Sequence, residues 1–63
     1  MPHIEITTWS GKNEEIKREL VKGITDKVAS ILNVEPKMVS IIIREVPKEN
    51  WAVGGKLDSD RNY

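Results

Sequence analysis

The stretch that decides the fold runs from Asn13 to Asn33, NEEIKRELVKGITDKVASILN. Its apolar residues recur at three- and four-residue spacing, the period of one face of an α-helix. These residues are Ile16, Leu20, Val21, Ile24, Val28, Ala29 and either Ile31 or Leu32. Asn13 is a good N-cap, Asn33 can close the helix in the left-handed conformation, and Pro36 prevents its continuation. The sequence therefore predicts an amphipathic helix that ends near Leu32.

One predicted strand lies on each side of this helix. In His3 to Trp9, alternation places two isoleucines on one face and His3, Glu5, Thr7 and Trp9 on the other. The second strand is expected over Val39 to Val46, and Pro47 ends it. The face that carries Ser40 in this strand also carries Ile42, Arg44 and Val46. Strand, helix and strand form one βαβ unit of an α/β fold, with parallel strands and a right-handed crossover.

A chain of 63 residues is expected to form a single domain over 1–63 with a marginal core. Apolar burial of about 95 kcal/mol is offset by a similar ordering cost of about 1.5 kcal/mol per residue. Cysteine is absent and there is one histidine, which removes disulfides and metal clusters as supports. The helix covers one sheet face only, and Trp9, Ile42 and Val46 lie on the other. We therefore expect copies of the chain to associate through that face.

The remainder of the chain is polar and rich in turn residues. Residues 48–57 contain the Gly54-Gly55 turn signal and are expected to form a short hairpin or to reach a neighbour. Residues 58–63 are interpreted as a frayed polar tail.

Charge and hydropathy exclude several classes of protein. Ten basic and ten acidic residues cancel, so no overall field attracts nucleic acid or an anionic membrane. The longest apolar run, Ile41 to Ile43, cannot span a bilayer, and the first residues lack the features of a signal peptide. A cytoplasmic protein is predicted.

The sequence contains no motif that pairs a nucleophile with a base, no metal-ligand spacing and no nucleotide-binding glycine pattern. Pro2 is the remaining candidate. Removal of Met1, which is general when the next residue is small, would leave a secondary amine at the start of a strand. An apolar pocket with cations nearby would lower the pKa of such an amine and make it a base near neutral pH.

In order and spacing, these features resemble the 4-oxalocrotonate tautomerase family over Pro2 to about Leu57. The resemblance rests on Pro2 opening the strand, Gly11 followed by the cation Lys12, the amphipathic helix, the second strand, and Trp51 four residues before Gly55. It implies subunits that pair into a four-stranded sheet backed by two helices, with three such dimers forming a homohexamer. It also implies a cofactor-independent isomerase of aromatic hydrocarbon catabolism.

The resemblance implies a role for each site residue. Pro2 is the general base and then the general acid. Lys12 stands where the family most often has an arginine for the distal carboxylate, and Trp51 where it has an aromatic residue. Trp9 falls at an apolar pocket-lining position. The substrate-binding set is then Lys12, Ser40, Arg44, Trp51 and Trp9.

Ser40 is the main departure, because the family's second arginine, which polarises the substrate carbonyl, belongs at that position. Arg44 lies on the same strand face and could reach back to replace it, or it could pair with a carboxylate at an interface. His3 is expected at the surface or an interface rather than as a second base. The substrate is predicted to be a small anionic enol or unsaturated 2-keto acid, and the departure at Ser40 favours a monoacid or a different binding mode over the family's usual dicarboxylate.

Two alternatives stay open. Pro2 could activate water for hydration or dehalogenation of an unsaturated acid, for which Glu5 is the only nearby carboxylate. Alternatively, the chain could be a non-catalytic oligomeric binding or scaffold module, which the loss of an arginine at Ser40 and retention of Met1 would favour.

Overall fold

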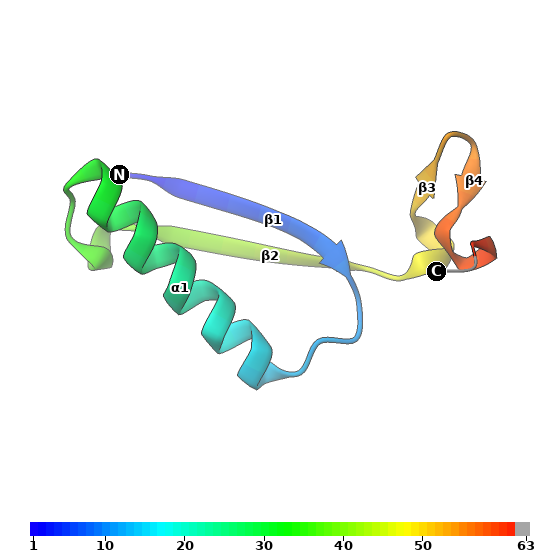
Figure 1. Cartoon of the computed structure of the whole chain (residues 1–63), viewed down its shortest axis with the longest axis horizontal. Coiled ribbons are helices and arrows are strands. Elements are labelled where there is room, and N and C mark those ends of the chain that lie inside the picture. The colour runs from blue at the N-terminus through cyan, green and yellow to red at the C-terminus, as the bar shows by residue number, and fades with distance from the viewer. Residues whose placement is uncertain (62–63) are drawn as a thin grey trace.

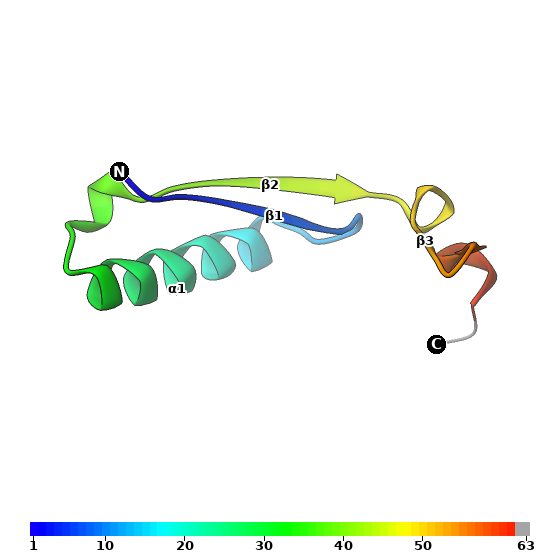
Figure 2. The ribbon, with the colours of Figure 1, turned by 90° about the horizontal axis from the view of Figure 1, so that it is seen from above.

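A computed structural model describes residues 1–61 and confirms the predicted βαβ unit. Strand β1 (His3–Trp9), helix α1 (Glu14–Leu32) and strand β2 (Ser40–Val46) follow one another along the chain (Figure 1). β1 and β2 pair in parallel over all seven residues of each strand. Seen from above, α1 lies along one face of this two-stranded sheet and leaves the other face open (Figure 2).

Both ends of α1 have the predicted caps. The Asn13 side chain accepts a hydrogen bond from the backbone N–H of Ile16 at 2.9 Å, which satisfies one of the free donors of the first turn. Asn33 has a φ of 55°, in the left-handed region, and its N–H bonds to the carbonyl of Ala29. These local contacts explain why the sequence alone located the helix correctly.

The second strand begins one residue later than expected. Pro36–Met38 form a short 3₁₀ helix, η1, and the Val39 N–H donates to the Pro36 carbonyl at 3.0 Å. Because this donor is used to close the turn, Val39 does not join the sheet and β2 starts at Ser40.

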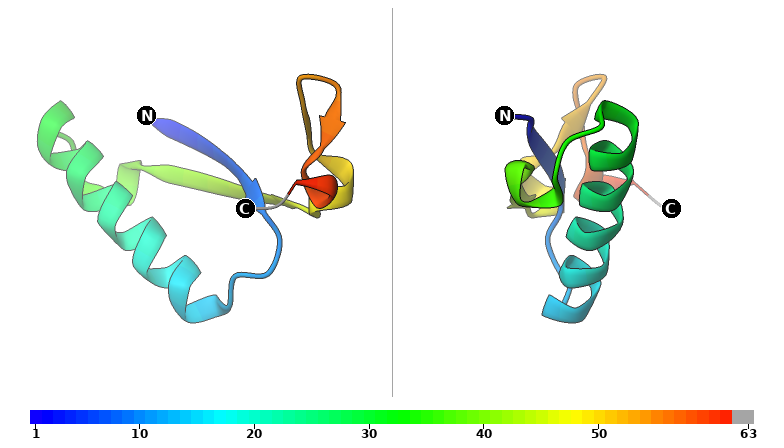
Figure 3. Two further views of the ribbon diagram at one scale, coloured as in Figure 1. Left: turned by 45° about the vertical axis from the view of Figure 1, so that its right-hand side comes forward. Right: turned by 90° about the vertical axis from the view of Figure 1, so that its left-hand side faces the viewer.

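The predicted hairpin is present after β2. A 3₁₀ turn, η2 (Lys48–Asn50), leads into the antiparallel strands β3 (Ala52–Val53) and β4 (Lys56–Leu57). Gly54 and Gly55 both have positive φ, 62° and 81°, as a tight hairpin turn requires. The hairpin stands beyond the carboxyl ends of β1 and β2, away from α1 (Figures 1 and 3).

The expectation of a frayed tail from residue 58 is wrong for the part that the structure describes. Asp58–Asp60 form a third 3₁₀ helix, η3, and Asp58 is only 3% exposed. The Asp58 carboxylate is held by the indole of Trp9, so this segment folds back onto the sheet. Residues 62 and 63 of the predicted tail lie outside the described residues.

One chain has little core of its own. Among the described residues, Ala29 is the sole buried hydrophobic residue. The accessible surface is 4928 Å², against about 4,100 Å² for a compact protein of this mass. The radius of gyration is 14.8 Å, against about 10.6 Å for a compact domain of this length. The chain therefore has the surface of a protein built to associate.

Of the three apolar residues expected on the uncovered sheet face, only Ile42 is exposed. Ile42 is 45% exposed there, whereas Trp9 and Val46 are half-buried. Trp9 is covered because Asp58 and Lys48 of the C-terminal segment contact it.

No helix within residues 1–61 is long and apolar enough to cross a membrane.

Candidate active site

Pro2 lies immediately before β1, at the amino end of the sheet, and is half-buried. The Pro2 carbonyl accepts a hydrogen bond from the Ser40 N–H at 3.1 Å. This bond holds the first residue of β2 next to Pro2. Met1 precedes Pro2 in the structure, and the Pro2 nitrogen is then an amide without basicity. Removal of Met1 would convert the same atom into a secondary amine.

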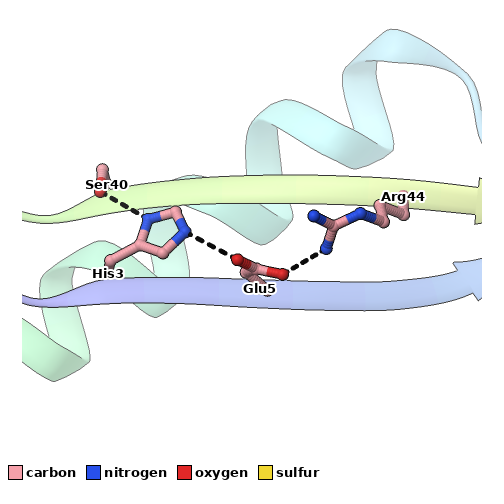
Figure 4. Close-up of polar contacts among 4 residues, drawn as sticks. All are labelled: His3, Glu5, Ser40 and Arg44. Atoms are coloured by element: carbon pink, nitrogen blue, oxygen red, sulfur yellow. Dashed lines mark hydrogen bonds and ion pairs between the residues drawn. The ribbon is translucent and has the colours of Figure 1, made fainter.

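Four polar side chains on the open sheet face form a continuous row, from Ser40 through His3 and Glu5 to Arg44 (Figure 4). His3 Nδ1 lies 2.8 Å from Ser40 Oγ, and His3 Nε2 lies 3.2 Å from Glu5 Oε2. The other Glu5 oxygen accepts from the Arg44 guanidinium in an ion pair. The strand register explains the row, because His3 faces Ser40 across the two strands and alternation puts all four side chains on one face.

The hydrogen bond from Arg44, followed by that from His3, lowers the pKa of Glu5 from its ordinary value. Glu5 is therefore a carboxylate that accepts hydrogen bonds and does not donate them. The structure thus pairs Arg44 with a carboxylate of its own chain. That Arg44 binds substrate remains a prediction, and Glu5 already accepts one of the N–H groups of its guanidinium.

Lys12 lies at the other end of β1. It follows Gly11, which has a φ of 112° and donates its N–H to the Glu45 carboxylate at 3.3 Å. Lys12 is exposed at the edge of a cavity of about 360 Å³ between the first turns of α1 and the sheet. Apart from Lys12, this cavity is lined by Ile6, Thr7, Thr8, Ile16, Lys17, Leu20, Ile43 and Glu45. Four of these other lining side chains are aliphatic, and Lys17 and Glu45 form an ion pair at the same cavity.

Trp9 and Trp51 form a second cavity near this end of the sheet, of about 200 Å³, together with Thr7, Thr8 and Asp58. The Trp9 indole N–H donates to Asp58 Oδ2 at 3.0 Å, and the Asp58 N–H donates to the Trp51 carbonyl at 2.7 Å. Lys48 Nζ lies 4.4 Å from the centre of the Trp9 ring, close enough for a cation–π contact. The two tryptophans predicted for the site are thus brought together, and Asp58 joins them.

The predicted site residues fall into two groups at opposite ends of the sheet. Pro2 and Ser40 mark one end, and Trp9, Lys12 and Trp51 mark the other. The seven residue steps from Pro2 to Trp9 span about 23 Å of extended strand. A small molecule cannot bridge both groups within one chain, so a site containing both needs a second copy.

Sequence reasoning missed Asp58 and the two side-chain contacts of His3, although His3 lies at the surface as predicted. Asp58 is one acid in a polar run, and no local pattern distinguishes it from its neighbours. His3 could have been found, because the alternation of both strands already put it on the face of Ser40 and Arg44. No group of three His, Cys, Asp or Glu residues within 1–61 is placed to hold a metal ion.

The half-buried Pro2 before the βαβ unit, the cationic loop at Lys12 and the two neighbouring tryptophans make a combination that known proteins share. The profile of the tautomerase enzyme family matches residues 2–61. A probable tautomerase of Halalkalibacterium halodurans is 31% identical over 61 residues, 97% of this chain and 100% of that protein. The 2-hydroxymuconate tautomerase of Bacillus subtilis is 32% identical over 60 residues, 95% of this chain and 97% of its own.

Solved structures agree with this assignment. The crystal structure of a 4-oxalocrotonate tautomerase homologue superposes with a TM-score of 0.87 at 35% identity, covering 100% of both chains. A chain of a heterohexameric 4-oxalocrotonate tautomerase from Chloroflexus aurantiacus reaches 0.91 at 32% identity, covering 98% of this chain and 100% of its own. The chain belongs to the tautomerase family, which supports an isomerase role.

Proposed function

We propose that this protein is a tautomerase that moves a proton within a small anionic enol or unsaturated 2-keto acid. After removal of Met1, the Pro2 amine acts as the general base and then as the general acid. The observation that carries the proposal is the position of Pro2, which opens β1 and is the residue at which the family match begins. No cofactor is required in this scheme, because both proton transfers use the same amine.

The proposed active unit is a homo-oligomer. Within residues 1–61 one edge of β1 is unpaired, and two-fold pairing of two such edges would make a four-stranded sheet backed by two helices, in which the two β1 strands are antiparallel and each β1–β2 pair stays parallel. In that arrangement Pro2 of one copy lies near the Trp9, Lys12 and Trp51 end of a second copy. Lys12 then binds a substrate carboxylate, and the two indoles exclude water around the amine. We propose a hexamer of three such dimers, acting in the cytoplasm in the breakdown of aromatic compounds.

The test compares the protein with Pro2→Ala after intact mass has confirmed that Met1 is absent from both. Ketonisation of phenylenolpyruvate and of 2-hydroxymuconate is followed across pH. We expect kcat/KM to fall about 10²- to 10⁴-fold in Pro2→Ala, because general acid–base catalysis contributes that much. Equal rates in the two proteins would exclude Pro2 as the catalytic group.

The scaffold alternative has one observation in its favour. Arg44, the nearest candidate to replace the missing arginine, is held by Glu5. Retention of Met1 in the natural protein, together with rates equal to those of Pro2→Ala, would support this alternative. Hydration is not favoured, because Glu5, its candidate carboxylate, is bound by both His3 and Arg44.

A further inference from the structure

The turn that carries Lys12 is short, and its two ends are anchored to different elements. On one side the Ser10 N–H donates to the Val46 carbonyl at 3.0 Å, which ties the chain to the end of β2. On the other side Asn13 caps α1. Gly11 and Lys12 lie between these anchors, in the connection from β1 to α1 (Figure 1). The backbone of these two residues therefore decides from which point the Lys12 side chain extends.

Packing does not hold Gly11 in its conformation. Its φ is 112°, in the range that favours glycine. A methyl group on its Cα would meet no atom within 4 Å beyond its chain neighbours, so the residue borders open space. A glycine in open space gives the backbone many conformations, and a hydrogen bond is needed to select one. The Glu45 carboxylate provides it, because the Gly11 N–H donates to Glu45 Oε2 at 3.3 Å.

The Glu45 carboxylate is itself held in place. Its other oxygen, Oε1, forms an ion pair with Lys17 of α1. The hydrogen bond from Lys17 lowers the pKa of Glu45 from its ordinary value, and the backbone N–H groups of Gly11 and Lys12 add to this effect. Glu45 is therefore ionised at neutral pH and joins three elements, namely β2, α1 and the turn between β1 and α1.

Glu45 also sets the charge of the cavity at whose edge Lys12 lies. Lys12, Lys17 and Glu45 all line the cavity of about 360 Å³ between α1 and the sheet. The pair of Lys17 with Glu45 is neutral overall, so Lys12 supplies the net positive charge of the cavity wall. An ammonium that is already paired with a carboxylate attracts a second anion less strongly. Lys12 is therefore the cation that is available to a substrate carboxylate at this end of the sheet.

We propose that Glu45 is a positioning residue for substrate binding, which fixes the Gly11–Lys12 turn so that Lys12 meets the substrate carboxylate. Glu45 touches no substrate in this scheme and acts through Lys12. Fixing the turn in advance lowers the ordering cost that binding would otherwise carry, so the benefit appears in substrate affinity. This inference rests on the proposed function, in which Lys12 binds the carboxylate and Pro2 moves the proton. Glu45 is therefore expected to act on KM, and Pro2 on kcat.

A first experiment reads the turn without using the reaction. Backbone ¹⁵N relaxation gives the order parameters of Gly11 and Lys12 in the native protein and in Glu45→Ala. We expect values near the rigid-backbone level of about 0.85 in the native protein and below about 0.6 in Glu45→Ala. Glu35→Ala is the matched control, since it removes a carboxylate that pairs with Lys37 beyond the far end of α1, and it should leave both values unchanged. Unchanged values in Glu45→Ala would overturn the proposal.

A second experiment measures KM and kcat for phenylenolpyruvate, using protein shown by mass to lack Met1. Glu45→Ala is expected to raise KM about three- to tenfold, the effect of one hydrogen bond, with kcat nearly unchanged. Glu45→Gln keeps the size of the side chain and one oxygen acceptor, and it should raise KM by a smaller factor. Glu35→Ala should keep the native KM. A native KM in both Glu45 variants, or a loss confined to kcat, would overturn the proposal.

The same change in a Lys12→Gln background separates positioning from a general loss of structure. Lys12→Gln alone is expected to raise KM, because the cation is gone. If Glu45 acts through Lys12, adding Glu45→Ala to Lys12→Gln raises KM no further. A further rise by the full factor seen in the single variant would show that Glu45 acts elsewhere, and it would overturn the proposal.

The two proposals fail in distinguishable ways. A loss of kcat in Pro2→Ala with a native KM in Glu45→Ala leaves Pro2 catalysis standing and removes the role of Glu45. Native rates in Pro2→Ala with a raised KM in Glu45→Ala support the role of Glu45 and remove Pro2 as the base. A lower kcat in Pro2→Ala together with a raised KM in Glu45→Ala supports both.

Discussion

The two ends of the β1–β2 sheet hold their polar groups by different means. At the Pro2 end, His3, Ser40, Glu5 and Arg44 lie on exposed strand faces and meet through strand register. At the other end, Asp58 is 3% exposed and bonds to Trp9, 49 positions away in sequence. The first arrangement forms as soon as the two strands pair, whereas the second requires the C-terminal segment to fold back. This difference predicts that substitutions at the Trp9 end have the larger effect on the free energy of unfolding. Substitutions at the Pro2 end are expected to act mainly on the rate of the reaction.

The largest expected effect on stability is at Asp58. Asp58→Ala removes the acceptor of the Trp9 indole N–H and the carboxylate that forms an ion pair with Arg61 at 3.5 Å, leaving the indole without its acceptor and the guanidinium without this counter-charge. We expect the free energy of unfolding to fall by about 3 kcal/mol, as when one member of a buried polar pair is removed. Urea unfolding followed by tryptophan fluorescence at constant protein concentration measures it.

Asp60→Ala, two residues along the same 3₁₀ helix at an exposed position, is the control and should be near neutral. Equal losses in the two variants would show that the segment is held by its backbone rather than by the Asp58 carboxylate.

A smaller effect is expected from Trp9→Phe, which removes the indole N–H but keeps an aromatic ring. Asp58 Oδ2 then loses its donor, and we expect a loss of about 1 to 3 kcal/mol in unfolding free energy. Trp51→Phe removes an indole N–H from the other wall of the same cavity and leaves the Trp9 to Asp58 bond intact. A greater loss in Trp51→Phe would contradict the assignment of Trp9 as the anchor of the C-terminal segment.

The smallest effect concerns acid stability at the Pro2 end. Because Arg44 lowers the pKa of Glu5 in the folded state, the unfolded chain binds more protons, and stability from this pair is lost as pH falls below the ordinary glutamate range of about 4.3. Arg44→Gln should therefore flatten the dependence of unfolding free energy on pH in this acid range. Lys27→Gln, which removes one positive charge from the exposed surface of α1, should leave the slope as in the native protein.

Much of the fold followed from local patterns. The bounds of α1 were predictable because Asn13 and Asn33 cap it through contacts within four residues. The hairpin was predictable because two adjacent glycines supply the positive φ angles of its turn. The start of β2 was missed by one residue, because Val39 closes the preceding 3₁₀ turn with its own N–H, which strand alternation cannot reveal.

The candidate site was predictable only in part. Resemblance located Pro2, Lys12, Trp51 and Trp9, and alternation put Ser40 and Arg44 on one face. The bonds among Ser40, His3 and Glu5 depend on the register of two strands separated by a helix, and no pattern within either strand sets that register. The bond between Asp58 and Trp9 joins residues 49 positions apart, and it forms only because the C-terminal segment folds back onto the sheet.

The sequence by itself determined the helix, the order of the elements and the parallel pairing of the strands, because these depend on periodicity, caps and chain order. Tertiary structure alone decided that Arg44 is held by Glu5, that His3 connects a hydroxyl to a carboxylate, and that Asp58 is buried against Trp9. Such contacts join residues that are distant along the chain, and their energies depend on distance and burial rather than on residue type. The sequence therefore indicated where a site could be. The fold decided which side chains within it are already hydrogen-bonded or ion-paired to one another.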